Sequence, residues 1–170
     1  PSGHCYGIGL GGFIMCGGHG WNSRLWGPGC ANLVGLDLVN ADGELIHADE
    51  RQNSDFLWAA RGGGPGFFGA AVRYYLKTYP RPPAHKFSAY VFPVEVADEL
   101  LSWLGEVQNS FPKYMECSAL GTHVDGQRVI RFGGRAMAYT EAEADAALDA
   151  FIRDAGPAIE AALAATRDRR

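Results

Sequence analysis

The sequence lacks the features that would assign it to several common classes of protein. Its longest stretch without Asp, Glu, Lys or Arg runs from Pro1 to Ser23, and about a third of that stretch is glycine. It therefore has no run of roughly 20 apolar residues that could span a membrane. It also lacks a basic excess, with 15 Lys and Arg against 19 Asp and Glu and a net charge of −4. We therefore expect neither a nucleic acid nor a membrane as partner.

Sequence signatures of hydrolases and nucleotide-binding loops are also missing. There is no Gly-x-Ser-x-Gly nucleophile motif, and no glycine-rich loop ends in Gly-Lys-Ser/Thr. Four cysteines in 170 residues do not make a disulfide scaffold. We assign Cys16, Cys30 and Cys117 to packing, and we assign no metal ligands.

Glycine is abundant and unevenly distributed. Residues 1–69 hold 17 glycines, and residues 70–170 hold only 6. The first glycine cluster, residues 3–20, has glycine at almost every second or third position. Because glycine has no Cβ, such a segment lets another body approach the main chain closely. This pattern favours a bound ligand in the first half of the chain, although a glycine-rich turn in a tight fold would look the same.

The first half of the chain also predicts a small number of regular elements. An Asp-Gly step between two apolar runs is a hairpin signal, and Asn53 or Ser54 is a good helix N-cap. The expected elements are a short helix near 21–26, strands at 33–39 and 44–47, a helix at 53–60 and a strand at 70–79.

The segment from Pro80 to Pro83 is the expected boundary, because neither a helix nor a sheet can absorb its prolines. Beyond it we expect strands and helices in the order β-α-β-β-α, with an antiparallel sheet and helices on one face. The expected elements are strands at 87–92, 115–123 and 128–138, and helices at 95–109, 141–154 and 157–167. Leu100, Leu101, Leu104 and Val107 should face inward. The fold class is therefore α+β.

The order of the motifs resembles that of a known family. The residues that carry the resemblance are Gly3–Gly12, Gly17–Trp21, Ser23, Arg24, Gly27, Asn32, Leu33, Asn40–Gly43, Asn53–Ala59, Arg61–Gly64, Phe68–Gly69, Tyr79 and Pro80. This string is similar to the flavin-binding core of the FAD-linked oxidases, in the berberine-bridge-enzyme-like branch of the vanillyl-alcohol-oxidase superfamily. The resemblance covers some eighty residues in order.

The resemblance implies a domain organisation. Residues 1–82 would be the second subdomain of a PCMH-type FAD-binding domain, and residues 83–170 the start of an α+β substrate domain. The chain begins with Pro1 rather than Met, and we expect it to be an internal fragment. In the family, the loop that binds the pyrophosphate precedes this part, and the catalytic residues of the substrate domain follow it.

The resemblance also implies FAD as cofactor. The expected cofactor-binding residues are Cys5, Gly7, Ile8, Gly9, Gly11, Gly12, Gly17, Gly18, Gly20, Gly69 and Ala70. Some members carry a cysteine at the position of Cys5 that is bonded to the flavin. The alternative is that Cys5 is simply a small buried residue. In the family, the bulk at the position of Ile8 is associated with how easily dioxygen reaches the reduced flavin.

The implied reaction is hydride transfer from a small organic substrate to flavin, followed by reoxidation by dioxygen or another acceptor. Whether the protein is an oxidase or a dehydrogenase stays open. Two other hypotheses are a catalytically inactive remnant and a metal-stabilised binding module. The second would use His4, Cys5, Cys16, His19 and Cys30, of which Cys16 and His19 have the spacing of metal ligands.

Overall fold

The computed structural model describes residues 3–167, and it divides the chain into two compact units. The N-terminal unit comprises Pro1–Pro80 and the C-terminal unit Arg81–Arg170. The division falls in the proline-rich segment 80–83, where missing N–H donors prevent continued strand pairing. Each unit has its own hydrophobic core.

The N-terminal unit is built on a three-stranded antiparallel sheet with the order β2-β1-β3. Its strands are β1 (Leu33–Val39), β2 (Leu45–Asp49) and β3 (Ala70–Leu76). The hairpin between β1 and β2 turns at Asn40–Gly43, where Gly43 has a φ of +79°. The predicted hairpin is therefore confirmed, whereas β3 ends three residues before the predicted end of its strand.

The short helices of this unit are α1 (Leu10–Met15), α2 (Ser23–Trp26) and α3 (Ser54–Ala60), with 3₁₀ turns at Gly29–Asn32 and Gly64–Gly66. Helices α1 and α3 pack against the sheet, whereas α2 has no buried side chain. The buried side chains of Phe13, Ile14 and Leu57 join Leu36 and Leu38 in one core. Helix α1 lies inside the first glycine cluster and was not predicted, because glycine is a poor helix former. Burial of Phe13 and Ile14 supplies the stabilisation that its glycines do not.

The C-terminal unit has a second three-stranded antiparallel sheet, in the order β4-β6-β5. The strands are β4 (Ala84–Pro93), β5 (Met115–Val124) and β6 (Gln127–Ala138). The predicted hairpin between the last two strands turns at Asp125 and Gly126, both with positive φ. Strand β6 lies in the centre and pairs with β4 through residues 129–138 and with β5 through residues 127–136.

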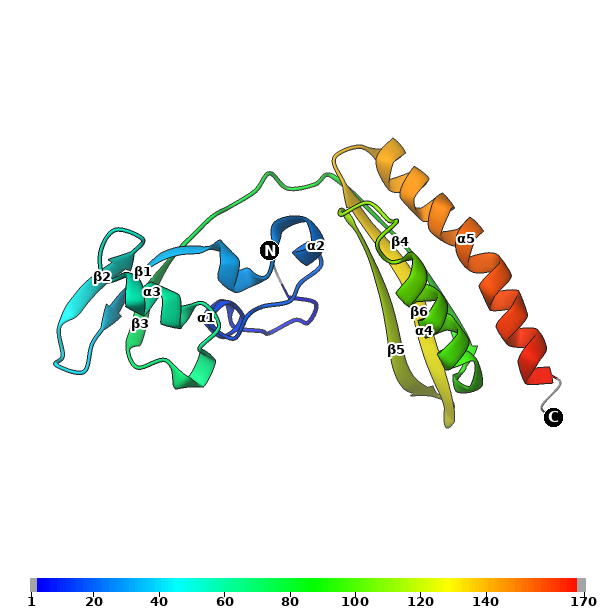
Figure 1. Cartoon of the computed structure of the whole chain (residues 1–170), viewed down its shortest axis with the longest axis horizontal. Coiled ribbons are helices and arrows are strands. Elements are labelled where there is room, and N and C mark those ends of the chain that lie inside the picture. The colour runs from blue at the N-terminus through cyan, green and yellow to red at the C-terminus, as the bar shows by residue number, and fades with distance from the viewer. Residues whose placement is uncertain (1–2, 168–170) are drawn as a thin grey trace. The chain divides into compact units, whose positions relative to one another are not determined.

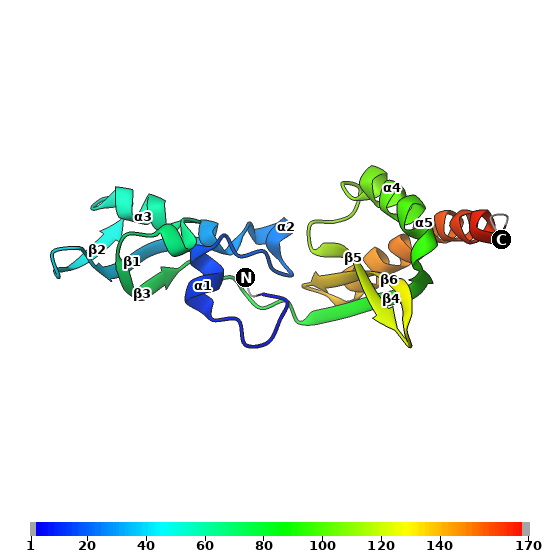
Figure 2. The same cartoon turned by 90° about the horizontal axis from the view of Figure 1, so that it is seen from below.

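Helices α4 (Ala97–Val107) and α5 (Glu141–Arg167) lie on the same side of this sheet, as Figures 1 and 2 show. A core of aromatic and aliphatic side chains fills the space between the two layers, with Phe132 and Phe151 fully buried at 5.6 Å between ring centroids. In α4 Leu100 is buried, as predicted, but Leu101 is 47% exposed. The prediction that Leu101 faces inward was wrong, because the buried stripe of the helix is narrower than the apolar run.

The prediction of two C-terminal helices was also wrong, because α5 is one continuous helix of 27 residues with Pro157 inside it. Proline cannot donate to the carbonyl of Arg153, and its ring crowds the preceding residue. That residue is Gly156, which has no Cβ to collide with the ring. The helix therefore passes the proline. Among residues 3–167, no helix has the length and apolar composition needed to cross a membrane.

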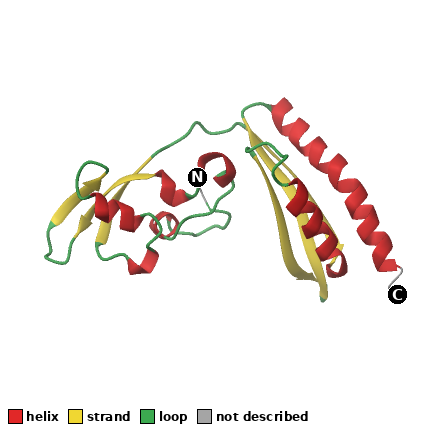
Figure 3. Ribbon diagram, viewed as in Figure 1, coloured by secondary structure: helices red, strands yellow, loops and turns green. Residues whose placement is uncertain are grey.

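The overall composition of helices and antiparallel strands confirms the α+β fold class. Figure 3 shows that much of the N-terminal unit is loop, especially before α1, whereas helices and strands make up most of the C-terminal unit.

Candidate functional site

The main chain of the first glycine cluster is exposed. Cys5 is solvent-exposed, Tyr6 has its full surface exposed at 106%, and Ile8 and Leu10 are half exposed at 50% and 53%. A turn at Tyr6 and Gly7 precedes α1, and the exposed side chains beside this main chain form a surface on which a flat, polar-edged ligand could lie. The alternative that Cys5 is a buried packing residue is wrong.

Some glycines in this cluster have no packing reason to be glycine. A Cβ added at Gly9 or at Gly12 would meet nothing within 4 Å, and neither residue has a positive φ. Gly7 and Gly17 also face open space, and their φ values of +78° and +102° require glycine for the path of the chain. At Gly9 and Gly12 the protein's described residues leave room that a bound molecule can use.

Other predicted site glycines are explained by the packing of the protein itself. A Cβ at Gly11 would lie 2.9 Å from the hydroxyl oxygen of Tyr74, and one at Gly18 would lie 2.6 Å from the carbonyl oxygen of Phe13. A Cβ at Gly69 would lie 2.5 Å from Cδ1 of Leu38. These three glycines allow close packing whether or not a cofactor is bound.

The remaining predicted residues differ in their surroundings. Gly20 is buried, and its N–H donates to the hydroxyl oxygen of Ser23 at 2.7 Å, so it begins the turn into α2. Gly17 and Gly18 accept backbone hydrogen bonds from Cys30 and Gly29 at 2.8 and 2.7 Å. Ala70 is exposed at the start of β3, next to Gly69.

Asn32 holds the end of α2 in place, a role that sequence reasoning missed. This buried side chain donates to the carbonyl oxygens of Trp26 and Pro28 at 3.1 and 2.9 Å. It also accepts a hydrogen bond from the hydroxyl of Tyr79 at 2.8 Å. The rings of Trp26 and Tyr79 stack with centroids 4.7 Å apart. Asn32 belongs to the motifs that resemble the family, but its role could not be predicted because its three partners come from distant or irregular segments.

A second feature that was not predicted is a charged network on the outer face of the N-terminal sheet. Nδ1 of His47 lies 2.6 Å from Oδ1 of Asp37, its cross-strand neighbour. Tyr75 donates to Oδ2 of Asp37 at 3.0 Å, and Arg73 lies 3.7 Å from the same oxygen. On the other side of the ring, Nε2 of His47 lies 3.5 Å from Oδ2 of Asp49.

The network shifts the protonation of its members. The hydrogen bond with Asp37 raises the pKa of His47 above its ordinary value of 6.5, and the same bond lowers the pKa of Asp37. The pKa of Asp49 is lowered chiefly because its carboxylate accepts hydrogen bonds from the N–H groups of Arg51 and Gln52. The three side chains therefore share a pH range in which all are charged.

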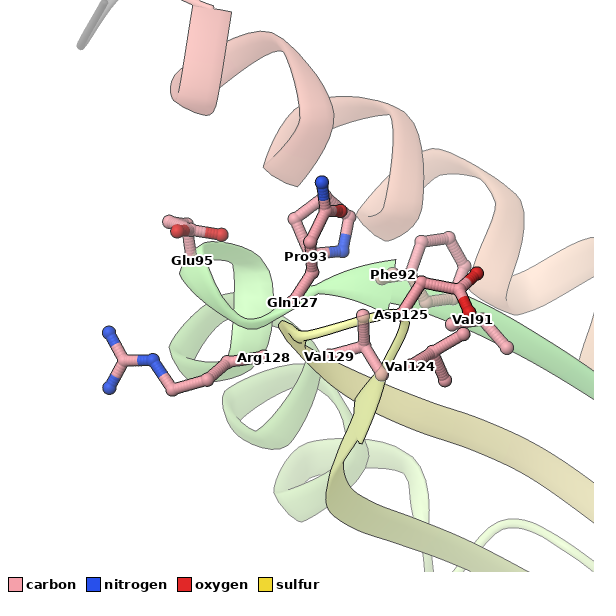
Figure 4. Close-up of a pocket in the computed structure, with 9 residues that line it drawn as sticks. All are labelled: Val91, Phe92, Pro93, Glu95, Val124, Asp125, Gln127, Arg128 and Val129. Atoms are coloured by element: carbon pink, nitrogen blue, oxygen red, sulfur yellow. The ribbon is translucent and has the colours of Figure 1, made fainter.

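Two hollows lie on the surface, one in each unit. The first, of about 650 Å³, lies beside the second glycine cluster, residues 62–69, and is lined by Cys30, Ala31, Trp58, Ala59, Arg61, Gly62 and Gly63. The second, of about 600 Å³, lies between β4 and the β5–β6 hairpin (Figure 4) and has an apolar floor that includes Val91, Val124 and Val129. Neither contains a predicted cofactor-binding residue.

The cysteines do not gather into a site. Cys16 is exposed although we assigned it to packing, whereas Cys30 and Cys117 are partly buried. In the part of the chain that the structure describes, no three His, Cys, Asp or Glu side chains are placed to hold one metal ion. The structure therefore does not bring His4, Cys5, Cys16, His19 and Cys30 together as ligands.

Comparison with known proteins agrees with the pattern of the sequence. Residues 1–49 match a family model described as an FAD binding domain. The FAD-linked oxidoreductase nodO of Hypoxylon pulicicidum is 45% identical over 121 residues, which cover 71% of this chain. The chain belongs to the FAD-linked oxidoreductase family. It spans only 27% of the length of nodO.

Solved structures place this FAD-linked oxidoreductase segment in the same structural group. Berberine bridge enzyme from Eschscholzia californica superposes with a TM-score of 0.75 at 27% identity, covering 91% of this chain and 31% of that one. The glucose dehydrogenase Phl p 4.0202 gives a TM-score of 0.70 at 27% identity and covers 81% of this chain and 27% of that one. An isoleucine-to-valine variant of Phl p 4, with the same TM-score, is described as a glucose oxidase. The predicted family and fold class are therefore confirmed.

Proposed function

We propose that this chain is the part of an FAD-dependent oxidoreductase that holds the flavin and begins the substrate domain. The complete enzyme oxidises a small organic molecule and passes the electrons to dioxygen or another acceptor. The observation that supports this best is the glycine-rich and largely exposed main chain of residues 5–12, which lies inside the segment that matches the FAD binding domain. Bound FAD supplies the hydride acceptor, which no amino-acid side chain can provide.

The residues present fit such a cofactor. A flavin ring needs a flat approach to the main chain and hydrogen-bond donors at its polar edge. Gly9 and Gly12 leave the approach open, since a Cβ at either meets nothing. Main-chain N–H groups of residues 5–12 are proposed to serve as those donors. Gly7, Ile8, Gly17, Gly18 and Gly20 complete the predicted cradle, and Gly69 and Ala70 are proposed to pass the adenosine.

Helix α1 anchors the proposed FAD-binding segment to the core of the N-terminal unit. Phe13 and Ile14 anchor it in the core, and Tyr74 on β3 donates to Sδ of Met15 at 3.2 Å. Because those anchors lie on the buried side of the helix, the exposed side keeps one conformation without ligand contacts. Such preorganisation lowers the entropic cost of binding.

The C-terminal unit, residues 83–170, is proposed to begin the substrate domain. The face of its sheet opposite α4 and α5 is not covered by any described residue of that unit. It exposes Phe87, Val91 and Leu120, whose exposed fractions are 70%, 54% and 59%. The guanidinium of Arg135 lies 5.5 Å from the ring centroid of Phe87 on this face. An apolar face with cationic groups suits a substrate with an apolar body.

The experiment compares two glycine-to-alanine variants. Gly12→Ala adds a methyl group to the exposed side of α1, whereas Gly105→Ala makes the same change at an open position in α4. Both should leave stability unchanged or raise it by about 0.5–1 kcal/mol, because alanine favours the helix. We expect Gly12→Ala alone to weaken FAD binding, by at least about tenfold, or about 1.4 kcal/mol.

FAD binding is measured by quenching of flavin fluorescence, with unfolding curves of each variant alongside. Equal FAD affinity in the two variants would contradict the proposed position of the flavin. A wild-type chain that binds no FAD would instead favour the inactive remnant.

A further inference from the structure

The His47 network connects the sheet of the N-terminal unit to the loop that starts α3. The carboxylate of Asp49 accepts hydrogen bonds from the N–H groups of Arg51 and Gln52 at 2.7 and 2.9 Å, which closes a tight turn at residues 49–52. The side chain of Asn53 donates to the carbonyl oxygen of His47 at 2.7 Å. His47 therefore contacts both ends of the segment 49–53, through its ring and through its main chain.

Asn53 depends on these contacts for its conformation. It occupies the N-cap position of α3 with a φ of +51°, in the left-handed region that costs energy for a residue other than glycine. Its side chain does not cap the helix, although the sequence predicted that Asn53 or Ser54 would do so. Its amide is instead bonded to His47. The start of α3 is thus held by attachment to β2 rather than by a cap of its own.

The two carboxylates beside the His47 ring differ in how many other partners they have. Asp37 on β1 has two further partners on β3, the hydroxyl of Tyr75 and the guanidinium of Arg73. Among the described residues, the only cationic side chain close to Asp49 is His47. When the imidazole loses its proton, Asp37 keeps Arg73. The carboxylate of Asp49, which accepts the hydrogen bonds of the loop, then loses its attraction to the ring. Deprotonation should therefore loosen the loop and leave the β1–β3 contact intact.

We propose that His47 is a pH-sensitive clamp, which holds the loop 50–53 and the start of α3 on the sheet while its ring is protonated. The clamp is closed below the raised pKa of His47 and opens as the pH rises through it. At the acid end it opens again when Asp37 and Asp49 become protonated, below their lowered pKa values. It is therefore closed at weakly acidic pH and open at alkaline pH.

The clamp is connected to the second glycine cluster through helix α3 and Arg61. Helix α3 runs from Asn53 directly into Arg61, which donates to the carbonyl oxygen of Leu33 at 2.9 Å and pairs with Glu50 at 3.3 Å. Glu50 lies in the loop that the clamp holds, so loosening the loop weakens one of the two contacts of Arg61. The consequence for FAD affinity rests on the proposed function, because only there do residues 62–69 lie near the cofactor.

The test is hydrogen–deuterium exchange of the peptide covering residues 50–56 at pH 6 and pH 9, corrected for the intrinsic exchange rate and made without FAD. We expect protection to fall about two- to fivefold at pH 9, the range that exposed ion pairs produce. In His47→Gln the difference between the two pH values should vanish. The matched control is His123→Gln, which removes an exposed histidine from β5 and should behave as the wild type.

A second variant separates the ion pair from the turn. Asp49→Asn keeps an oxygen that can accept from Arg51 and Gln52 but removes the charge that faces His47. In Asp49→Asn the peptide 50–56 should be protected from exchange at pH 6 only as well as it is in the wild type at pH 9. The clamp is disproved if protection of this peptide in the wild type does not change with pH. It is also disproved if protection in His47→Gln changes with pH as much as in the wild type, or if protection in Asp49→Asn at pH 6 equals that of the wild type at pH 6.

FAD affinity at the same two pH values tests the coupling alone. The ratio of the FAD affinity at pH 6 to that at pH 9 is compared between the two proteins. A larger ratio in the wild type than in His47→Gln supports the coupling, and equal ratios overturn it. A chain that exchanges as expected but binds no FAD would refute the proposed function while the clamp stands.

Discussion

The hydroxyl oxygen of Tyr74 lies 2.9 Å from the point where a Cβ at Gly11 would stand. The same hydroxyl donates to Sδ of Met15 at 3.2 Å, so one side chain on β3 contacts both the beginning and the end of α1. Gly11 was predicted as a cofactor-binding residue. The structure gives it a second role, in which the missing side chain lets the helix lie close to the sheet.

Gly11→Ala should therefore destabilise the N-terminal unit by about 1–3 kcal/mol, the usual cost of overpacking. Adding Tyr74→Phe should recover part of that loss, because the phenyl ring lacks the oxygen that the new methyl group meets. A double-mutant cycle from urea unfolding measures the coupling between the two sites. Additive effects would show that the contact does not limit packing, and Gly12→Ala serves as the control for an added methyl group in α1.

Asn32→Ala should cost about 1–3 kcal/mol, because the carbonyl oxygens of Trp26 and Pro28 and the hydroxyl of Tyr79 each lose a partner. Asn32→Asp should be just as harmful, since a carboxylate cannot donate to two carbonyl groups. Chemical denaturation followed by tryptophan fluorescence reports on Trp26, which stacks on Tyr79. Asn109→Ala, at an exposed position, is the control, and a similar loss there would refute the role of Asn32.

Pro157→Ala should stabilise α5, by up to about 3 kcal/mol in an exposed helix interior, because it restores a backbone donor. Gly156→Ala with Pro157 in place should be destabilising instead, because its Cβ would meet the proline ring that the glycine avoids. Thermal unfolding and far-ultraviolet circular dichroism measure both effects. A loss of helix content or stability in Pro157→Ala would indicate that the proline ends one helix and starts another.

If Cys5 is a covalent anchor for the flavin, the colour should remain with the protein after denaturation and precipitation. The exposed thiol makes this bond sterically accessible. Mass spectrometry of the peptide containing Cys5 should then show the added mass of the flavin, and Cys5→Ala should abolish that species. A Cys5→Ala protein with an unchanged covalent flavin at this peptide would exclude the anchor, and Cys16→Ala is the control for loss of another exposed thiol.

Ile8→Val should increase the rate at which dioxygen reoxidises the reduced flavin of the complete enzyme. Ile8 is half exposed in the proposed cradle, so shortening it opens space without disturbing the core. The isoleucine-to-valine variant of Phl p 4, a glucose oxidase, makes this substitution the natural choice. Stopped-flow reoxidation measures the rate, with Leu10→Val as control, and no increase would mean that Ile8 does not limit access.

The prediction from sequence succeeded where local signals agree with the packing. Turn residues such as Gly43 and Gly126 have the positive φ that their hairpins require, and the strands beside them alternate as expected. It failed at α1, whose glycines oppose a helix that Phe13 and Ile14 stabilise by burial. It also failed at Pro157, where a neighbouring glycine removes the clash that normally ends a helix.

The sequence by itself determined the α+β class, the two hairpins, the division near Pro80 and the family, because these depend on turn chemistry and on the order of motifs along the chain. Only the tertiary structure could sort the glycines of the first cluster, since Tyr74 and Phe13 decide which of them the fold requires. At Gly9 and Gly12 the fold itself leaves room for a side chain, so packing does not explain these glycines. The clamp at His47 also needed the folded chain, because Asp37, Asp49 and Tyr75 meet the ring only through strand pairing.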